Sequence, residues 1–327
     1  ESLRIDLKSD EGVRVIKEMI PSVDVVIHNF RPGVMDKLGL GSETLRTINP
    51  KLIYTAISGF GTEGPMSSVP AYDPIIQAHA GVAATQGKGD EPAFMRTLLC
   101  DKITGYTACQ AVTSALFLRE RTGVGQHIDL SMIDSGLFFI FLDGFQNHTL
   151  LSDDHERAGM LIDILYDPWV CSDGGVIISA GSYEMQKRFL TSIDMQHLLD
   201  DERFATFENQ MRNIHVLKGL VSKRCAQLSC DDMVGRLREV DVPCAKVMTR
   251  DEVLAQDQLV ANGTVDIYDH PIAGSSRRVL APPLFGGERL APGSGAPTHG
   301  QHTRAVLESF GISETDIQKL SSEGVVA

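Results

Sequence analysis

The sequence predicts an α/β protein with two parts, a large domain built around a parallel sheet and a smaller α/β domain. Over residues 1–150, short apolar runs alternate with helical patterns, which is typical of parallel β-α-β units. A second alternation of this kind starts at Trp169 and continues to about Glu239. With 327 residues, the chain is long enough for two such domains.

The first elements follow from the spacing of apolar residues. Leu3–Leu7 is expected to be a strand, and Ser9–Ile20 has the apolar spacing of a helix. Asp24–Phe30 and Lys51–Ile57 are the next strand candidates, and residues 33–49 show a helical pattern between them. These elements would form successive β-α-β units of the large domain.

A longer helix is expected directly after Asp101. Its apolar face consists of Ile103, Ala108, Val112, Ala115 and Leu116. The helix should end before Gly123. Asp101 stands at its start, where a carboxylate accepts hydrogen bonds from first-turn N–H groups and is favoured by the helix dipole. On the pattern alone, Asp101 is a plain N-cap.

The second half of the chain divides by composition. Residues 151–165 break the rhythm and are expected to be a linker, and residues 166–240 are expected to form the small α/β domain, with a strand inside Gly174–Ser182. Residues 241–327 contain Pro- and Gly-rich segments and a last helical pattern over His302–Gly324. We expect this part to be a second linker and a return to the large domain.

Charge and composition exclude several classes of protein. The formal net charge of −13 argues against a general nucleic-acid binder, because phosphate contacts need a basic face. No run approaches 18 consecutive apolar residues, so we expect neither a membrane-spanning helix nor a membrane partner. The six cysteines include no Cys-x-x-Cys pair, which favours a reducing, cytoplasmic location.

One motif could indicate a cofactor site, and the histidines could indicate a metal site. Gly59–Gly64 matches the G-x-G-x-x-G fingerprint of dinucleotide sites, but Pro65 and Pro70 oppose the helix that this fingerprint requires. A loop in close backbone contact with another segment is therefore the preferred interpretation, and a nicotinamide oxidoreductase stays as an alternative. The ten histidines show no metal-ligand spacing, so we expect no metal.

Eight further segments stand out, in this order: HNFRPGVMDKLGL, ISGFGTEGP, AYDPIIQAHAG, CDKITGYTA, RTGVGQHIDLSMID, DDERFAT, VPCAKV and HPIAG. Together they resemble family III CoA transferases, the group containing formyl-CoA and carnitine CoA transferases, over essentially the whole chain. The resemblance implies a Rossmann-like large domain, a small α/β domain and an interlocked homodimer. Because this family carries some tens of residues before the first strand seen here, we expect an N-terminal portion of the large domain to precede residue 1.

The resemblance also implies a chemistry for Asp101. In the family, the aspartate at this position attacks an acyl-CoA thioester and forms, in turn, an aspartyl anhydride and an aspartyl-CoA thioester. A covalent relay of this kind divides one difficult exchange into easier steps. The implied activity is transfer of CoA from an acyl-CoA donor to a free carboxylic acid. Coenzyme A and acyl-CoA are then substrates, and no tightly bound cofactor is expected.

Positions that hold CoA in formyl-CoA transferase match residues of this chain. They are Ile5, Asp6, Leu7, Lys8, Asn29, Phe30, Arg31, Lys37, Val69, Pro70, Ala71 and Tyr72. Since CoA is strongly anionic, Lys8, Arg31 and Lys37 would supply local positive charge, while Phe30 would offer an apolar face. The family's glycine-rich lid has no counterpart, because residues 157–175 occupy that region with a different sequence. The acyl donor and acceptor are therefore not identified.

Two alternatives remain within the resemblance. The related α-methylacyl-CoA racemases exchange an α-proton with an Asp and a His, and their His precedes an Asp in a Gly-His-Asp context. This chain has Tyr72 at that place, and a phenol is a poor base at neutral pH. A non-catalytic CoA-binding relative is the second alternative, and the intact Asp101 argues against it.

Overall fold

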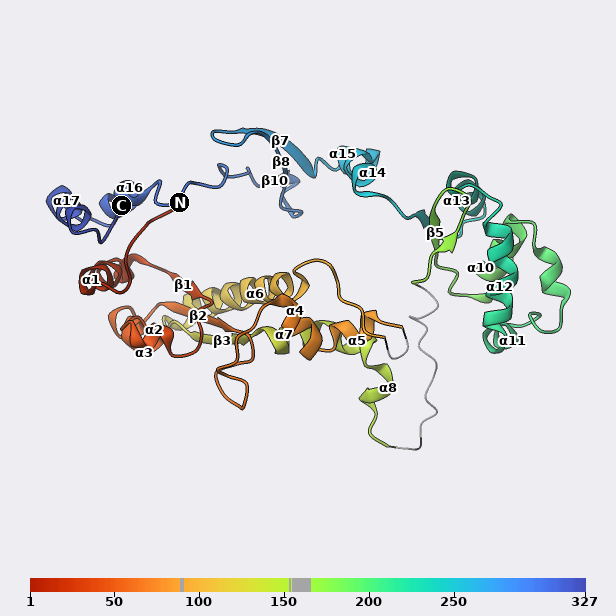
Figure 1. Cartoon of the computed structure of the whole chain (residues 1–327), viewed down its shortest axis with the longest axis horizontal. Coiled ribbons are helices and arrows are strands. Elements are labelled where there is room, and N and C mark those ends of the chain that lie inside the picture. The colour runs from red at the N-terminus through yellow and green to blue at the C-terminus, as the bar shows by residue number, and fades with distance from the viewer. Residues whose placement is uncertain (89–90, 153, 155–165) are drawn as a thin grey trace. The chain divides into compact units, whose positions relative to one another are not determined.

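A three-stranded parallel sheet organises the first part of the chain. The computed structural model describes residues 1–88, 91–152, 154 and 166–327 (Figure 1). The sheet has the order β1-β2-β3, with β1 at Val25–His28, β2 at Ile53–Ser58 and β3 at His127–Ser131. Both neighbouring pairs are parallel. The apolar runs therefore predict β1 and β2 correctly, whereas β3 is missed because its alternating sequence contains only two apolar residues.

Helices connect these parallel strands, as parallel pairing requires. Between β1 and β2 lie α2 (Val34–Lys37) and α3 (Ser42–Ile48). Between β2 and β3 lie α4 (Asp73–His79), α5 (Val82–Gln86) and α6 (Leu99–Thr122). After β3 the chain continues into α7 (Met132–Gly144) and α8 (Gln146–Thr149). Gly123 has a φ of 75° and its N–H bonds to Arg119 O, so α6 ends where the sequence predicts.

The chain's first residues pair with its last ones instead of forming a strand. Leu3–Leu7 contains only an isolated bridge between Ile5 and Val326, and Asp6 N–H donates to Val325 O at 2.8 Å. The predicted strand is therefore wrong, because a single bridge to the C-terminus replaces a ladder. The expected helix is confirmed as α1 (Asp10–Met19), which the short 3₁₀ helix η1 (Ile20–Ser22) follows.

Two helices end the chain where one was expected. They are α16 (Thr303–Ser309) and α17 (Glu314–Ser322). Gly311 has a φ of 81°, a left-handed conformation that interrupts the helix, and the Ser313 side chain accepts the Asp316 N–H to start the next one. Buried residues of both helices, Leu307 and Leu320 among them, pack in one cluster with Val15 and Met19 of α1.

A second part of the chain has its own antiparallel sheet in the order β4-β5-β6. The strands are β4 (Trp169–Val170), β5 (Gly175–Ile178) and β6 (Cys244–Lys246). The helices are α10 (Tyr183–Ser192), η2 (Gln196–Asp200), α11 (Phe207–Arg212), α12 (Ile214–Cys225) and α13 (Cys230–Glu239). Phe204, Ile193 and Leu237 are fully buried in its core. We call this part the small domain.

The chain from β6 to α16 consists of short elements. They are α14 (Arg250–Ala255), α15 (Asp257–Ala261), β7 (Val265–His270), β8 (Gly274–Val279), β9 (Leu284–Phe285) and β10 (Glu288–Arg289).

By their contacts, the described residues form two units. Residues up to 154 and Ser294–Ala327 belong to one unit, and residues 166–293 belong to the other. Residues 241–327 were expected to be a linker and a return to the large domain; of these, residues 241–293 group with the small domain and Ser294–Ala327 with the first unit. Of the predicted linker 151–165, residues 153 and 155–165 lie outside the described part.

Candidate active site

Asp101 is the third residue of α6, not the residue before it. The helix begins at Leu99, its N-cap residue is Leu98, and that residue makes no side-chain capping bond. The predicted N-cap position is therefore wrong, although Asp101 does lie in the first turn. Its side chain is exposed. The position leaves the carboxylate accessible at the positive end of a 24-residue helix.

The capping acceptor comes from another helix. Asp73, at the start of α4, is only 2% exposed, and its Oδ2 accepts the Asp101 backbone N–H at 3.1 Å. Its Oδ1 accepts from Gln77 Nε2 at 2.5 Å. Gln77 in turn bonds to the backbone of Met95 and Thr97, just before α6. A buried hydrogen-bond network thus holds the start of α6 against α4.

Sequence reasoning missed Asp73, although a signal was present. Asp73 stands directly before Pro74, and this pair is typical of the beginning of a helix. That signal places Asp73 at a helix start. It does not reveal that the carboxylate bonds to a second helix 28 residues further along the chain.

The surroundings of Asp101 raise the pKa of its carboxyl group. Partial loss of water around the group is the larger cause, although the side chain as a whole is exposed, and the negative charge of nearby Asp73 is the second. Burial also raises the pKa of the neighbouring Cys100 thiol to about 11, so that thiol stays protonated at neutral pH. A raised pKa makes the Asp101 carboxylate more basic. The helix terminus should lower this pKa by stabilising the ionised form, but the two effects that raise it are larger.

The glycine-rich loop after β2 lies directly against the Val69–Tyr72 segment. A Cβ atom added to Gly59 would lie 2.3 Å from the Ala71 Cβ, so only glycine fits there. The chain stays irregular from Gly59 to Tyr72, and the next helix is α4. Because no helix opens at these glycines, the dinucleotide interpretation fails, and the predicted close-approach loop is confirmed.

This loop and the start of α6 share one apolar cluster. Ala71 and Leu99 pack against a buried group that includes Ile76 and Cys100. Tyr72 is the N-cap residue of α4, and its side chain is 80% exposed. The structure therefore brings the end of the predicted Val69–Tyr72 segment close to the first turn that carries Asp101.

Away from Asp101, a pocket of about 350 Å³ lies near the ends of β1 and β2. It is lined by His28, Phe30, Arg31, Pro32, Gly33, Met35, Asp36, Ser42, Tyr54, Ala56, Ile57, Ser58, Thr62, His127 and Asp129. We call it the strand-end pocket. Besides residues at and after the ends of β1 and β2, the wall includes Tyr54 and His127, so the pocket also extends over one face of the sheet. Of the residues predicted to bind CoA, Phe30 and Arg31 line it.

Aromatic rings form much of the wall of the strand-end pocket. His28 Nδ1 accepts the Phe30 N–H at 3.3 Å, and burial lowers the pKa of His28, with His127 as a second cause. Burial raises the pKa of Tyr54 to about 12, and its hydroxyl donates to Leu40 O at 3.1 Å. Neutral rings therefore form much of the wall. Sequence reasoning missed His28, Tyr54 and His127, which the parallel register places on one face of the sheet.

The other predicted CoA residues do not line this pocket. Leu7 packs in the cluster of Met35 and Tyr54, so it supports the pocket from behind. Ala71 and Tyr72 lie at the apolar cluster described above. The remaining ones are Ile5, Asp6, Lys8, Asn29, Lys37, Val69 and Pro70. Ile5 is half-buried and the others are exposed. Lys8 and Lys37 therefore have accessible ammonium groups without a place in the wall.

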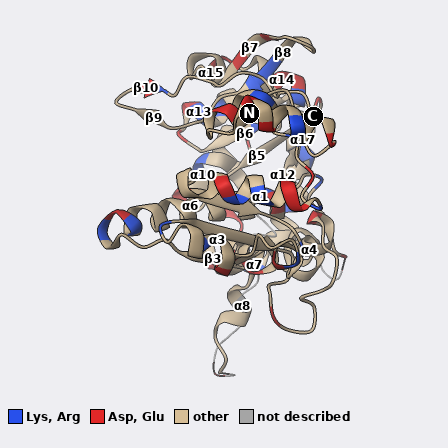
Figure 2. Ribbon diagram, turned by 90° about the vertical axis from the view of Figure 1, so that its left-hand side faces the viewer, with Lys and Arg blue, Asp and Glu red and all other residues tan. Residues whose placement is uncertain are grey.

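The described residues show neither a metal site nor a membrane-spanning helix. No group of three or more His, Cys, Asp or Glu side chains there is arranged to hold a metal ion. No helix in the described ranges is long and apolar enough to cross a membrane. Figure 2 shows Lys and Arg residues interspersed with Asp and Glu residues along the ribbon.

Comparison with known proteins gives a consistent result. The sequence model of CoA-transferase family III matches residues 1–303. The chain is 33% identical to an acetyl-CoA:oxalate CoA-transferase of Acetobacter aceti, over 83% of this chain and 72% of the relative. It is 27% identical to a succinyl-CoA:glutarate CoA-transferase of Mus musculus, over 100% of this chain and 76% of the relative.

Solved structures agree in fold. A CAIB/BAIF family protein from Brucella suis superposes with a TM-score of 0.79 and is 30% identical, with 94% of this chain and 80% of that chain covered. A hypothetical protein from Mycobacterium tuberculosis gives a TM-score of 0.80 at 25% identity, with 94% and 82% covered. Sequence match, relatives and fold all lead to the same conclusion: the chain belongs to CoA-transferase family III and is a CoA-transferase.

Proposed function

We propose that this enzyme moves CoA from an acyl-CoA donor to a free carboxylic acid, with Asp101 as the nucleophile. The observation that carries the proposal is the exposed Asp101 carboxylate in the first turn of α6, a turn whose Asp101 backbone N–H is held by buried Asp73. Among the residues that the structure describes, no cation pairs with the Asp101 carboxylate, and it has no evident structural task because Asp73 already caps the helix.

The proposed reaction balances without an added oxidant, reductant or net proton. The Asp101 carboxylate attacks the thioester carbonyl, and the C–S bond breaks. CoA departs as a thiolate, and Asp101 is now joined to the acyl group as a mixed anhydride. The thiolate attacks the Asp101 carbonyl and releases the donor acid, which leaves an aspartyl-CoA thioester. The acceptor carboxylate expels the thiolate and forms a second anhydride. Attack of the thiolate on the acceptor carbonyl then gives the new acyl-CoA and restores Asp101.

Local electrostatics support this assignment. The raised pKa of Asp101 makes its carboxylate a stronger nucleophile than an ordinary surface aspartate. The dipole of α6 favours the negative charge that develops on the carbonyl oxygen during attack. Cys100, although next to Asp101, is buried with a raised pKa and is a poor competing nucleophile.

The strand-end pocket is the proposed anchor of CoA. Arg31 offers a guanidinium for a phosphate, and Phe30 is 45% exposed and offers a ring face for an apolar part of the ligand. Lys8 and Lys37 would add positive charge from outside the pocket, with Ile5–Leu7 and Asn29 beside them. Val69–Tyr72 would carry CoA toward Asp101, because Ala71 packs in the cluster at the start of α6.

An apolar surface on α7 supports the proposed interlocked homodimer. Phe138, Phe139 and Leu142 are 84%, 62% and 85% exposed. Large apolar side chains gathered in this way mark interaction surfaces. A second copy of the chain is the proposed partner that covers this surface, in agreement with the family resemblance.

The six cysteines are all free thiols, which supports a reducing compartment such as the cytoplasm.

The experiment that tests the function is a matrix of donors and acceptors. Acetyl-CoA, succinyl-CoA and formyl-CoA are offered with oxalate, glutarate and citramalate, the compounds in the names of the relatives. New acyl-CoA is read by mass spectrometry. Exchange of an α-proton without CoA transfer would favour the racemase alternative instead. Binding of CoA with no turnover over a broad panel would favour the non-catalytic alternative.

A further inference from the structure

Lys102, the residue after Asp101, places a positive charge at the same end of α6. Its Nζ donates to Thr97 Oγ1 at 2.6 Å, and Thr97 precedes the first helical residue, Leu99. The lysine side chain therefore folds back toward the beginning of the helix, where Asp101 also lies. The Lys102 side chain is exposed, so its ammonium group is open to a ligand.

The hydrogen-bond network that holds the start of α6 also positions the Lys102 ammonium group. Gln77, which is 1% exposed, donates from Nε2 to Thr97 O at 3.1 Å and to Asp73 Oδ1. Asp73 in turn accepts the Asp101 N–H. The residue that binds the lysine and the turn that carries Asp101 are thus tied to the same two buried side chains.

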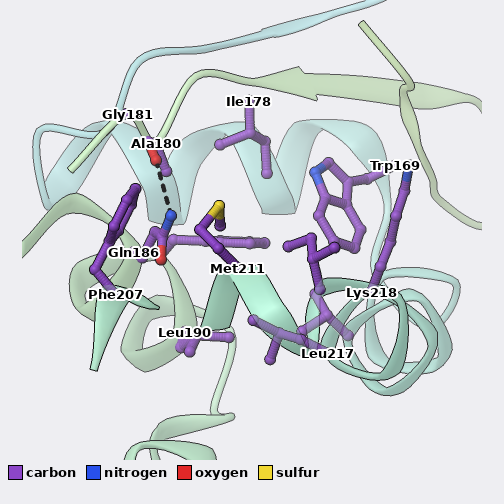
Figure 3. Close-up of a pocket in the computed structure, with 13 residues that line it drawn as sticks. Trp169, Ile178, Ala180, Gly181, Gln186, Leu190, Phe207, Met211, Leu217 and Lys218 are labelled. Atoms are coloured by element: carbon purple, nitrogen blue, oxygen red, sulfur yellow. Dashed lines mark hydrogen bonds between the residues drawn. The ribbon is translucent and has the colours of Figure 1, made fainter. Parts of the chain in front are cut away.

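The charge of Lys102 has no counter-charge among the described residues, because no carboxylate there forms an ion pair with it. Thr97 occupies one of the three N–H donors of the ammonium group. A positive charge is also disfavoured at the N-terminal end of a helix, whose own partial charge is positive. By contrast, Lys218 of the small domain, in the wall of the pocket drawn in Figure 3, pairs with Asp167 Oδ2 at 2.7 Å. Lys102 thus keeps two donors for an anionic ligand.

The separation of Lys102 from Asp101 indicates which part of a substrate the ammonium group would contact. Neither oxygen of the Asp101 carboxylate lies within 4.0 Å of Lys102 Nζ. A substrate carboxylate that reacts at Asp101 is therefore not the best partner for the lysine, whereas a second anionic group a few carbon atoms away is. Leu98, between Thr97 and the first turn in the chain, is 56% exposed and offers an apolar contact to those carbon atoms.

We propose that Lys102 is a specificity-determining residue, which binds the distal carboxylate of a dicarboxylic acid while the other carboxylate reacts at Asp101. The inference rests on the proposed transfer reaction and adds the class of acid to it. It favours diacids with a short apolar chain between the carboxylates, such as glutarate. A monocarboxylic acid of the same length leaves the ammonium group unpaired.

The test compares glutarate with valerate, acids of equal chain length of which only glutarate has a second carboxylate. Each is offered to the full chain as acceptor with the best donor of the matrix above, and new acyl-CoA is measured by mass spectrometry. We expect the parent to prefer glutarate in kcat/KM by at least about five-fold, because the second carboxylate pairs with Lys102. The preference should lie in KM and not in kcat, since this contact exists both before and during the reaction.

Variants assign the preference to the charge at position 102. Lys102→Met keeps the length of the side chain without its charge, so KM for glutarate should rise at least about five-fold while valerate is used as by the parent. Lys102→Arg keeps the charge and should keep the preference. Lys51→Met is the control, since Lys51 is also exposed but precedes β2 and not α6. The control should behave as the parent does.

Three results would overturn the proposal: equal use of the two acids by the parent, an unchanged preference in Lys102→Met, or an equal loss of kcat for both acids in that variant. A parent that transfers CoA to no acid of the matrix would contradict the transfer reaction itself. Binding then decides the role of Lys102, because glutarate and not valerate should raise the melting temperature of the parent, and neither acid should raise that of Lys102→Met. If that difference is absent, the inference fails as well.

Discussion

At the scale of single residues, two aspartates at the start of α6 have different roles: Asp73 caps the helix, and Asp101 is the proposed nucleophile. Asp101→Asn should leave folding nearly unchanged, because the side chain is exposed and Asp73 supplies the cap. CoA transfer should fall to background, since an amide is not a competent nucleophile. The check is single-turnover transfer with mass spectrometry of the trapped Asp101 peptide. Asp10→Asn, an exposed first-turn aspartate of α1, is the control and should keep full activity.

The second prediction at this scale concerns pH. Asp73 raises the pKa of Asp101 through its negative charge, so Asp73→Asn should lower the pKa of Asp101. Transfer requires ionised Asp101, and the acid limb of the pH–rate profile should therefore move to lower pH. The amide oxygen can still accept one hydrogen bond, whereas Asp73→Ala removes the acceptor of the Asp101 backbone N–H and should cost about 1–3 kcal/mol of stability. A limb that stays in place would contradict the coupling of the two carboxylates.

At the scale of elements, the contact between the loop after β2 and the Val69–Tyr72 segment is the sensitive point. Gly59→Ala introduces a Cβ atom 2.3 Å from the Ala71 Cβ, so the segment must move. We expect a loss of about 1–3 kcal/mol in stability and weaker CoA binding, measured by denaturation and calorimetry. Gly235→Ala in α13 is the control, since nothing lies within 4 Å of its added Cβ. It should stabilise the protein by about 0.5–1 kcal/mol.

At the scale of the whole molecule, the apolar surface of α7 governs assembly. Phe138→Lys should not harm an isolated chain, because that side chain is 84% exposed. In a homodimer that buries this surface, it should shift the molecule to monomer and lower the melting temperature. Light scattering at micromolar concentration is the measurement. Val260→Lys, at a single exposed apolar residue of α15, is the control. A monomeric, active parent would remove the dimer from the proposal.

The sequence alone determined several local features of this protein. Apolar spacing located α1, β1, β2 and the body of α6, and Gly123 marked the end of that helix, because these signals act over a few neighbouring residues. The order of eight motifs was enough to indicate the family that the comparisons then showed. Asp101 could be named as the reactive residue only through that resemblance, since its local pattern suits an ordinary cap.

Only the tertiary structure decided what surrounds these residues. Asp73 bonds to a backbone N–H 28 residues away, and Ile5 pairs with Val326, contacts that no short-range pattern encodes. Tyr54 and His127 share a pocket because the parallel register sets them side by side on one sheet face. Packing in the small domain buries Gln186 Oε1 without a hydrogen-bond partner among the described residues. Local spacing specifies elements, whereas burial and pairing depend on which distant segments come into contact, and folding of the whole chain establishes those contacts.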